Sequence, residues 1–331
     1  MSGVRLRLAL DEEGLTLPET GRIAVIGPDA EFDLSMLPSG RVDVVQSFYP
    51  HHTAFSDLGY TCIPTLGGNY AACLICLPRS KQRARALIAQ AEAATPDGLI
   101  LVDGQKVSGI ESVLREARGR VQILGTLSKA HGKLIWFKTP GDCFGDWAQP
   151  NAAQNKDGFH TVPGIFSADA IDPASALLAA SLPQKMGRVV ADMGAGWGYL
   201  SSQILTRDSV EKVHLIEAEQ MALDCARRNI ADQRAEFHWA DATTWAPAQA
   251  PDSVVMNPPF HIGRRGEPAL GQAFIAASAA VLGPSGHLWM VANRHLPYES
   301  ALNNLFVKVE ETSGSSKFKV LHAHRPMRRR R

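Results

Sequence analysis

The sequence contains no apolar stretch long enough to cross a bilayer as a helix. Charged residues or glycines interrupt each apolar run well before the roughly 20 residues that a span requires. The opening residues, MSGVRLRLALDEEGL, also lack the apolar block of a secretory signal peptide. We therefore expect a soluble, cytoplasmic protein with no membrane partner.

Cysteine is scarce and does not follow a disulfide pattern. The five cysteines are an odd number, which suits a reducing compartment better than a disulfide framework. Cys73 and Cys76 form a CxxC pair, but they stand inside the apolar run AACLICLP, and no second CxxC or nearby histidine pair completes a zinc site. We expect these two cysteines to lie in a buried strand, and we expect no bound metal.

A general excess of positive charge is also missing. The 34 lysines and arginines balance 33 aspartates and glutamates, which leaves a formal net charge of +1 at pH 7. Any affinity for nucleic acid must therefore come from local basic clusters. The candidates are Arg79, Lys81, Arg83 and Arg85, the pair Arg264 and Arg265, and the tail residues Arg325, Arg328, Arg329, Arg330 and Arg331. Solvated helix faces and frayed termini have the same composition, so charge alone does not assign these clusters a function.

From Arg188 onward, apolar strand-like runs alternate with helical patterns, which is typical of a doubly wound parallel α/β sheet. The expected strands are RVVADMG (188–194), VHLIEA (213–218), AEFHWAD (235–241), SVVMNPPF (253–260) and GHLWMVAN (286–293). The expected helices lie near 198–206, 218–231 and 271–282, and the segment PYESALNNLF (297–306) follows the last of the parallel strands. Two last β-like runs, 307–312 and 317–324, are joined by Ser-Gly-Ser and predict an antiparallel hairpin at the sheet edge.

The first half of the chain ends in a similar order of elements. Strand-like 71–78 precedes a basic helix (79–94), a strand (98–104), a helix (109–117) and the paired runs 121–127 and 133–138. This parallel predicts a duplicated domain whose first copy is degenerate. The first copy has one glycine, Gly27, where the second has DMGAGWG, and it lacks the NPPF tetrapeptide. We predict a domain at 1–150 that docks RNA and supports a catalytic domain at 151–331, across a linker rich in Gly, Pro, Asn and Asp.

The glycine-rich DMGAGWG predicts a cofactor site. Gly194, Gly196 and Gly198 follow a strand and precede a helix, where glycine permits a tight turn and lets a ligand approach the backbone. Tyr199 occupies the third glycine position of a dinucleotide fingerprint, which disfavours an NAD-linked oxidoreductase. Carboxylates at the ends of the next two strands suit ribose hydroxyls and an adenine amino group. The predicted cofactor-binding residues are Asp192, Gly194, Ala195, Gly196, Glu217, Ala218, Asp241, Ala242 and Asn257.

The tetrapeptide from Asn257 to Phe260 predicts the substrate site. Pro258 and Pro259 remove two backbone donors and stiffen the chain, so nearby carbonyls keep a fixed direction. An amino group could donate to the Asn257 side-chain oxygen and to the Pro258 carbonyl, while Phe260 offers a face for stacking. We predict Asn257, Pro258 and Phe260 as the catalytic residues. The predicted substrate-binding residues are Pro259, His261, Arg264 and Arg265.

These residues resemble the class I S-adenosylmethionine methyltransferases with an (Asn/Asp)-Pro-Pro-(Phe/Tyr) motif, which modify exocyclic amines of bases and glutamine amides. PGIFSADAIDPASALL (163–178), NPPFHIG (257–263), VANRHLPYESALNNLF (291–306) and KFKVLHA (317–323) are similar to the ribosomal RNA small subunit guanine-N2 methyltransferase C family and its large-subunit relative. The likeness runs from about Pro163 to His322 and is weaker over the first half. Glu217 departs from the aspartate that is common in relatives at its position, a change that a ribose-binding carboxylate tolerates.

The resemblance implies two tandem Rossmann-like methyltransferase domains, the first degenerate, with S-adenosylmethionine as the cofactor. It implies N2-methylation of a guanine in ribosomal RNA, with the small subunit or its 16S rRNA as the partner, and we expect a monomer. Methyl transfer to an amine needs no metal. His261 could relay the proton, or it could be a loop residue that makes only a local hydrogen bond. The alternatives are a large-subunit guanine methyltransferase, a protein glutamine N5-methyltransferase, and a non-catalytic RNA-binding assembly factor.

Overall fold

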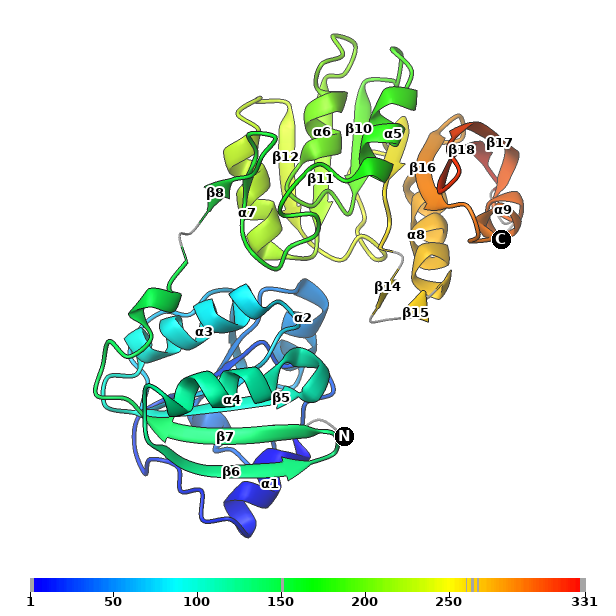
Figure 1. The fold of residues 1–331 in the computed structure, drawn as a ribbon. Coiled ribbons are helices and arrows are strands. Elements are labelled where there is room, and N and C mark those ends of the chain that lie inside the picture. The colour runs from blue at the N-terminus through cyan, green and yellow to red at the C-terminus, as the bar shows by residue number, and fades with distance from the viewer. Residues whose placement is uncertain (1–2, 150–151, 260, 263–264, 267, 328–331) are drawn as a thin grey trace. The chain divides into compact units, whose positions relative to one another are not determined.

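The computed structural model describes residues 3–149, 152–259, 261–262, 265–266 and 268–327. The chain divides into two compact units, Met1–Asn151 and Ala152–Arg331, and each is described by itself. Each unit is a seven-stranded sheet with helices packed against it (Figure 1). In the described residues, no helix is both long enough and apolar enough to span a membrane.

The second unit contains a mostly parallel sheet in the strand order β12-β11-β10-β13-β16-β18-β17. The strands are β10 (Val189–Met193), β11 (Lys212–Glu217), β12 (Ala235–Trp239), β13 (Ser253–Met256), β16 (His287–Asn293), β17 (Phe306–Gly314) and β18 (Phe318–Pro326). The first five strands are parallel to one another, and β18 runs antiparallel to both β16 and β17. The carboxyl ends of the five parallel strands therefore meet at one edge of the sheet, where ligands bind in open α/β sheets.

Two helix layers cover the faces of this sheet. The helices are α5 (Pro173–Ser181), α6 (Tyr199–Ile204), α7 (Gln220–Asn229), α8 (Pro268–Val281) and α9 (Tyr298–Asn303). Neighbouring strand residues point to opposite faces. Val255 of β13 joins the core under α5, α6 and α7, whereas Val254 joins the core under α8 and α9. Burial on both faces explains why these strands are continuous apolar runs rather than alternating ones.

The first unit repeats this topology, with the strand order β3-β2-β1-β4-β5-β7-β6. Its strands are β1 (Ile23–Ile26), β2 (Val42–Val45), β3 (Thr61–Ile63), β4 (Ala72–Cys76), β5 (Leu99–Gln105), β6 (Ile123–Lys129) and β7 (Gly132–Lys138). Its α-helices are α1 (Val4–Asp11), α2 (Tyr49–Asp57), α3 (Lys81–Ala94) and α4 (Ile110–Arg118). Each sheet carries its antiparallel strands in the same place, so the predicted fold of two tandem Rossmann-like domains is confirmed. The RNA-docking and catalytic roles of the two halves stay predictions.

The sequence analysis predicted no element before residue 71 and no helix at α9; elsewhere the predicted α-helices and strands agree with the structure except at three places. The final hairpin is formed by β17 and β18, and β17 lies at the sheet edge as predicted. Helix α5 was not predicted, although the Asp172 side chain accepts a hydrogen bond from the Ser175 amide and Pro173 occupies the first turn, which is a standard start signal. Short antiparallel pairs, β8 (Ala153–Gln154) with β9 (His160–Thr161) and β14 (His261–Ile262) with β15 (Arg265–Gly266), replace parts of the expected loops.

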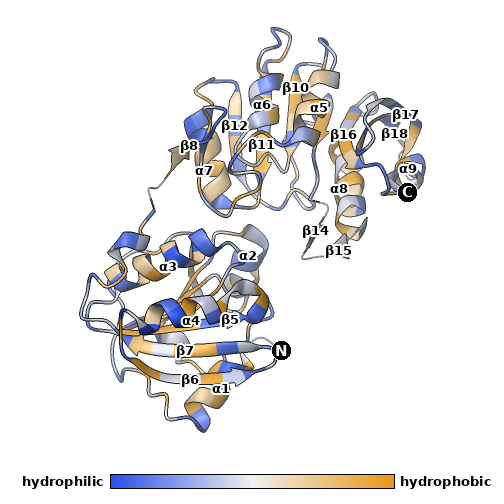
Figure 2. Ribbon diagram, in the orientation of Figure 1, coloured by the Kyte–Doolittle hydropathy of each residue, from blue (hydrophilic) through white to orange (hydrophobic). Residues whose placement is uncertain are grey.

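Hydrophobic residues concentrate on the strands and on the inner faces of the helices (Figure 2). Cys73 is fully buried in β4 and Cys76 is half-buried, and both thiols are free, as expected for core cysteines in a strand.

Candidate active site

The glycine loop joins β10 to α6 and is fastened to β11 by its backbone. The amides of Gly194 and Ala195 both donate to the Ile216 carbonyl, at 2.9 and 3.0 Å. Gly194, Gly196 and Gly198 have φ angles of 77°, 57° and 91°, a region that other residues rarely adopt. A methyl group placed on Gly196 would meet no atom within 4 Å. The loop thus presents open space at Gly196, where a ligand can approach the backbone.

Gly198 has a different role from Gly196. A methyl group on Gly198 would lie 2.8 Å from Ile230 and 3.2 Å from Ala226 at the end of α7. This glycine therefore permits close packing of α6 against α7, while the free surface of the loop is at Gly196.

Glu217, the last residue of β11, holds the loop from the neighbouring strand. Its Oε2 accepts a hydrogen bond from the Gly196 amide at 2.8 Å, and its Oε1 accepts one from the Glu219 amide at 2.7 Å. Burial raises the pKa of the Glu217 carboxyl, and these backbone donors oppose that rise. Each carboxylate oxygen retains a lone pair for a further donor such as a ribose hydroxyl.

Asp192 is the most enclosed carboxyl of the predicted site. It lies in β10 with no exposed surface, and its Oδ2 accepts a hydrogen bond from Ser201 Oγ at 2.6 Å. Its Oδ1 is buried and has no partner among the described residues. Burial raises the pKa of Asp192 to about 7, and the nearby Glu217 carboxylate adds to this rise. A cation bound at this edge would stabilise the ionised forms of both acids.

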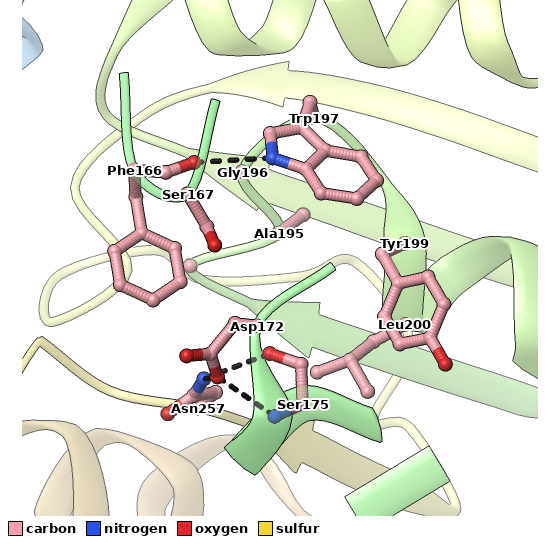
Figure 3. Close-up of a pocket in the computed structure, with 11 residues that line it drawn as sticks. Phe166, Ser167, Asp172, Ser175, Ala195, Gly196, Trp197, Tyr199, Leu200 and Asn257 are labelled. Carbon is pink, nitrogen blue, oxygen red and sulfur yellow. Dashed lines mark hydrogen bonds between the residues drawn. The ribbon is translucent and has the colours of Figure 1, made fainter. Parts of the chain in front are cut away.

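Asn257 follows β13, and two side chains of α5 set the direction of its amide. The Asn257 Nδ2 donates to Asp172 Oδ2 at 3.0 Å and to Ser175 Oγ at 2.8 Å (Figure 3). Asp172 Oδ2 also accepts from the Ser175 amide at 2.8 Å, which starts the helix. Because the NH2 group is bound to these partners, Asn257 Oδ1 faces away from them. That oxygen is buried and has no partner among the described residues, so an acceptor is left for an incoming N–H group.

Gly194, Gly196 and Asn257 line one pocket at the carboxyl edge of the second sheet (Figure 3), whereas Asp192 and Glu217 are not part of its lining. Its lining is Phe166, Ser167, Asp172, Ser175, Gly194, Ala195, Gly196, Trp197, Tyr199, Leu200 and Asn257. Trp197 Nε1 donates to the Phe166 carbonyl at 3.1 Å, which fixes the segment before α5 to the glycine loop. The Phe166 ring is 64% exposed, so a large apolar group stands at the rim of the pocket. The pocket therefore combines a loop with free backbone, a buried amide acceptor and an aromatic rim.

The other predicted residues have mixed outcomes. Asp241 lies two residues beyond β12, and its Oδ1 accepts from the Thr243 amide at 2.8 Å and from the Thr243 hydroxyl at 2.7 Å. The Ala218 carbonyl accepts from Trp239 Nε1 at 2.9 Å, and Ala242 is buried. These three residues do not line the pocket, but they follow the strands β11 and β12 at the same sheet edge.

The predicted substrate residues after β13 are only partly described. Pro258 is buried and Pro259 is exposed. The backbones of His261 and Arg265 belong to the antiparallel pair β14 and β15. Phe260 and Arg264 lie outside the described residues.

The sequence analysis missed Asp172, Ser175, Phe166 and Trp197 as members of the site. The Asp-Pro start of α5 could have been recognised, but its contact with Asn257 could not, because Asp172 and Asn257 are 85 residues apart in the chain. The place of Trp197 and Phe166 beside the glycine loop is likewise visible only in the tertiary structure.

The pocket and its edge fit S-adenosylmethionine in the chemistry of their donors and acceptors. The open face at Gly196 admits a close ligand, Glu217 has free lone pairs for ribose hydroxyls, and the buried carboxyl of Asp192 is complementary to positive charge. A pyrophosphate would instead place negative charge beside two buried carboxyls, which disfavours a dinucleotide.

The chain is similar to several known proteins. The family model described as methyltransferase small domain matches residues 156–322. The ribosomal RNA small subunit methyltransferase C of Hahella chejuensis is 30% identical over 231 residues, which span 67% of this chain and 68% of the relative. The protein of the same name from Alteromonas mediterranea is 27% identical over 306 residues, 89% of this chain and 83% of the relative. A ribosomal RNA large subunit methyltransferase G from a Shewanella strain is 26% identical over 282 residues, 80% of this chain and 73% of the relative.

A solved structure shares the fold of the whole chain. It is a T. thermophilus 16S rRNA N2 methyltransferase in complex with AdoMet and guanosine, with a TM-score of 0.78 and 22% sequence identity, covering 98% of this chain and 93% of the other. The matched family model, the length shared with the Hahella relative and the duplicated sheet topology together show that the chain belongs to the methyltransferase small domain family, in its ribosomal RNA small subunit methyltransferase C group.

Proposed function

We propose that the second unit binds S-adenosylmethionine and methylates the N2 amine of a guanine in ribosomal RNA, with 16S rRNA of the small subunit as the substrate. The names of the relatives support the RNA and the subunit. The guanosine and AdoMet of the T. thermophilus complex support the base and the cofactor. The observation that carries the proposal is the buried oxygen of Asn257 beside the glycine loop, which has no partner in the part of the chain that the structure describes.

The Asn257 amide suits an exocyclic amine as the acceptor of one of its protons. Asp172 and Ser175 occupy its NH2 group, so the oxygen side of the amide is left for the substrate. A guanine N2 lone pair is delocalised into the ring. Hydrogen bonds from its two protons, to Asn257 Oδ1 and the Pro258 carbonyl, would hold the nitrogen in place and favour its rehybridisation as the new bond forms.

S-adenosylmethionine, when bound, supplies a methyl group on a positively charged sulfur that departs as a neutral thioether. Glu217 is the proposed ribose ligand, and Asp241 with the Ala242 amide is the proposed adenine contact. The glycine loop at Gly196 permits the close approach, and the ionised Asp192 offsets positive charge nearby. Bond formation leaves a cationic nitrogen whose proton passes to solvent, with His261 as a proposed relay.

The first unit is proposed to dock RNA, although its basic helix has a structural role as well. Lys81 and Arg85 of α3 both form ion pairs with Glu116, at 2.7 Å, and Arg85 also lies over the Trp147 ring. These contacts tie α3 to α4 and reduce the charge available for phosphates. Deleting residues 1–150 is expected to abolish RNA methylation while the second unit, if it folds, still binds S-adenosylmethionine. Full methylation by the folded remainder would contradict the docking role.

The test of the function uses the purified full-length chain, labelled S-adenosylmethionine, and small subunits, large subunits or a protein acceptor in separate reactions. We expect N2-methylguanosine in small-subunit RNA by mass spectrometry. Label in large-subunit RNA would favour the relatives of that name, and label on a glutamine would overturn the RNA substrate. Binding without transfer to any acceptor would favour an assembly factor.

A further inference from the structure

A second cluster of ligand-type side chains lies on the α8 and α9 side of the same sheet, outside the pocket. His214 of β11 pairs in register with Glu236 of β12, and Ile216 pairs with His238. Since alternate residues of a strand share a face, all three polar side chains project to the same side as Ile216, which packs in the core with α8 and α9. The Trp245 ring packs at a tilt against both histidine rings, with centroids 5.3 and 5.4 Å away.

The nitrogen and oxygen atoms of this cluster converge on one point. His214 Nδ1 lies 3.0 Å from His238 Nε2 and 3.2 Å from Glu236 Oε2, and one ligand atom from each residue lies within 4.8 Å of the others. Tetrahedral Zn²⁺ with ligands at about 2.0–2.1 Å separates neighbouring ligand atoms by about 3.3 Å. Two of the three separations are within a few tenths of an ångström of this value. Rotation of the Glu236 side chain, which is 43% exposed, can adjust the third.

Hydrogen bonding alone satisfies this arrangement poorly. A neutral imidazole carries one N–H. A single proton on His214 Nδ1 would have to serve both the His238 nitrogen and the Glu236 oxygen, whereas a cation would satisfy all three lone pairs. Glu236 Oε1 is bound to Lys212 at 2.6 Å, which leaves Oε2 for this role.

We propose that His214, His238 and Glu236 form a zinc site that joins the edge strand β12 to β11, with solvent as the fourth ligand. Two imidazoles and one carboxylate suit a borderline divalent metal. The site is separate from the methyl-transfer pocket and takes no part in the chemistry proposed there. Its expected effect is to stabilise the strands whose carboxyl ends lead to Glu217 and Asp241.

A second histidine group in this unit provides a control. His322 Nε2 lies 2.9 Å from His287 Nδ1, while His322 Nδ1 lies 3.1 Å from Glu310 Oε1. The two nitrogens of the His322 ring thus face different partners, so the ligand atoms diverge. His324 stacks at this group and can be changed without touching the proposed site.

The experiment titrates the full-length, tag-free, metal-depleted protein with Zn²⁺ by calorimetry and with Co²⁺ by visible absorption. We expect one equivalent of metal per chain, the absorption of tetrahedral Co²⁺, and a higher thermal midpoint with Zn²⁺, because the metal binds only the folded state. His238→Ala and Glu236→Gln should lower the affinity by more than the roughly 10- to 100-fold that loss of an outer-shell partner costs. His324→Asn should still bind one metal ion per chain.

Circular dichroism of the metal-free variants, together with their binding of S-adenosylmethionine, checks that they remain folded. Three results would overturn the proposal. The folded protein could show no saturable Zn²⁺ binding, Glu236→Gln and His238→Ala could both still bind one Zn²⁺ per chain with unchanged affinity, or His324→Asn could lose the bound Zn²⁺. Since S-adenosylmethionine binding is measured separately, failure of the zinc site leaves the proposed methyl transfer untouched.

Discussion

Replacing Asp192 with asparagine should stabilise the second unit, and the gain should grow as the pH rises. Burial raises the pKa of the Asp192 carboxyl from 3.8 to about 7, so the folded protein holds this proton more tightly than the unfolded chain does. Ionisation of Asp192 therefore opposes folding. The effect is absent below about pH 4, increases through the interval between the two pKa values, and is complete above about pH 7.

The expected size follows from the same two pKa values. Their difference corresponds to about 4 kcal/mol of unfolding free energy at pH 8, gained at about 1.4 kcal/mol per pH unit between about pH 4 and 7. Asparagine has the same shape, and its Oδ1 can still accept the hydrogen bond from Ser201. An amide and a protonated carboxyl differ by a constant, so the pH dependence of the difference between variant and wild type is the quantity that tests the reasoning.

Two buried thiols allow each unit to be followed separately during unfolding in urea. Cys225 of α7 is 2% exposed and reports the second unit, whereas Cys73 of β4 is fully buried and reports the first. Pulse labelling of the thiols followed by peptide mass spectrometry gives an unfolding free energy for each unit at several pH values. The Cys225 difference between Asp192→Asn and wild type should rise with pH, and the Cys73 difference should stay near zero. A Cys225 difference that does not change with pH would refute a raised pKa for Asp192.

Three further predictions concern the proposed site. The affinity for S-adenosylmethionine should rise from about pH 5 to 7. The cationic ligand favours the ionised forms of Asp192 and Glu217, and because the pKa values of both acids are raised, binding below about pH 7 must release protons. Calorimetry should therefore show an affinity that depends less on pH for Asp192→Asn than for the wild type. Asn257→Ala should lower kcat for RNA methylation by about 10²- to 10³-fold, with cofactor binding retained; near-normal turnover would remove the amide from the mechanism. Gly196→Ala should fold but bind the cofactor at least about tenfold more weakly, because a methyl group would fill the open space, at a backbone cost of about 1 kcal/mol. Gly158→Ala, with a φ of 85° and equally open surroundings, is the matched control, and equal losses of affinity in both variants would count against a ligand at Gly196.

Local pattern was sufficient for most of the strands and helices from residue 71 onward. The runs of β10 and β13 are strong signals because each of these two strands is buried on both faces, and the glycines of the loop mark a turn that needs positive φ. Repetition of this succession was enough to predict the duplicated fold. The two-residue strands β14 and β15 are too short to give a pattern, and α5 was missed despite its start signal.

The sequence by itself thus determined the fold class, the glycine loop and the chemical character of Asn257, because each depends on residues that are neighbours in the chain. Only the tertiary structure decided which way the Asn257 amide points, since Asp172 and Ser175 reach it from 85 and 82 residues away. The convergence of His214 with His238 likewise depends on the register between β11 and β12. A shift of one residue in that register would turn one partner to the opposite face, and no local pattern in the chain records which register forms.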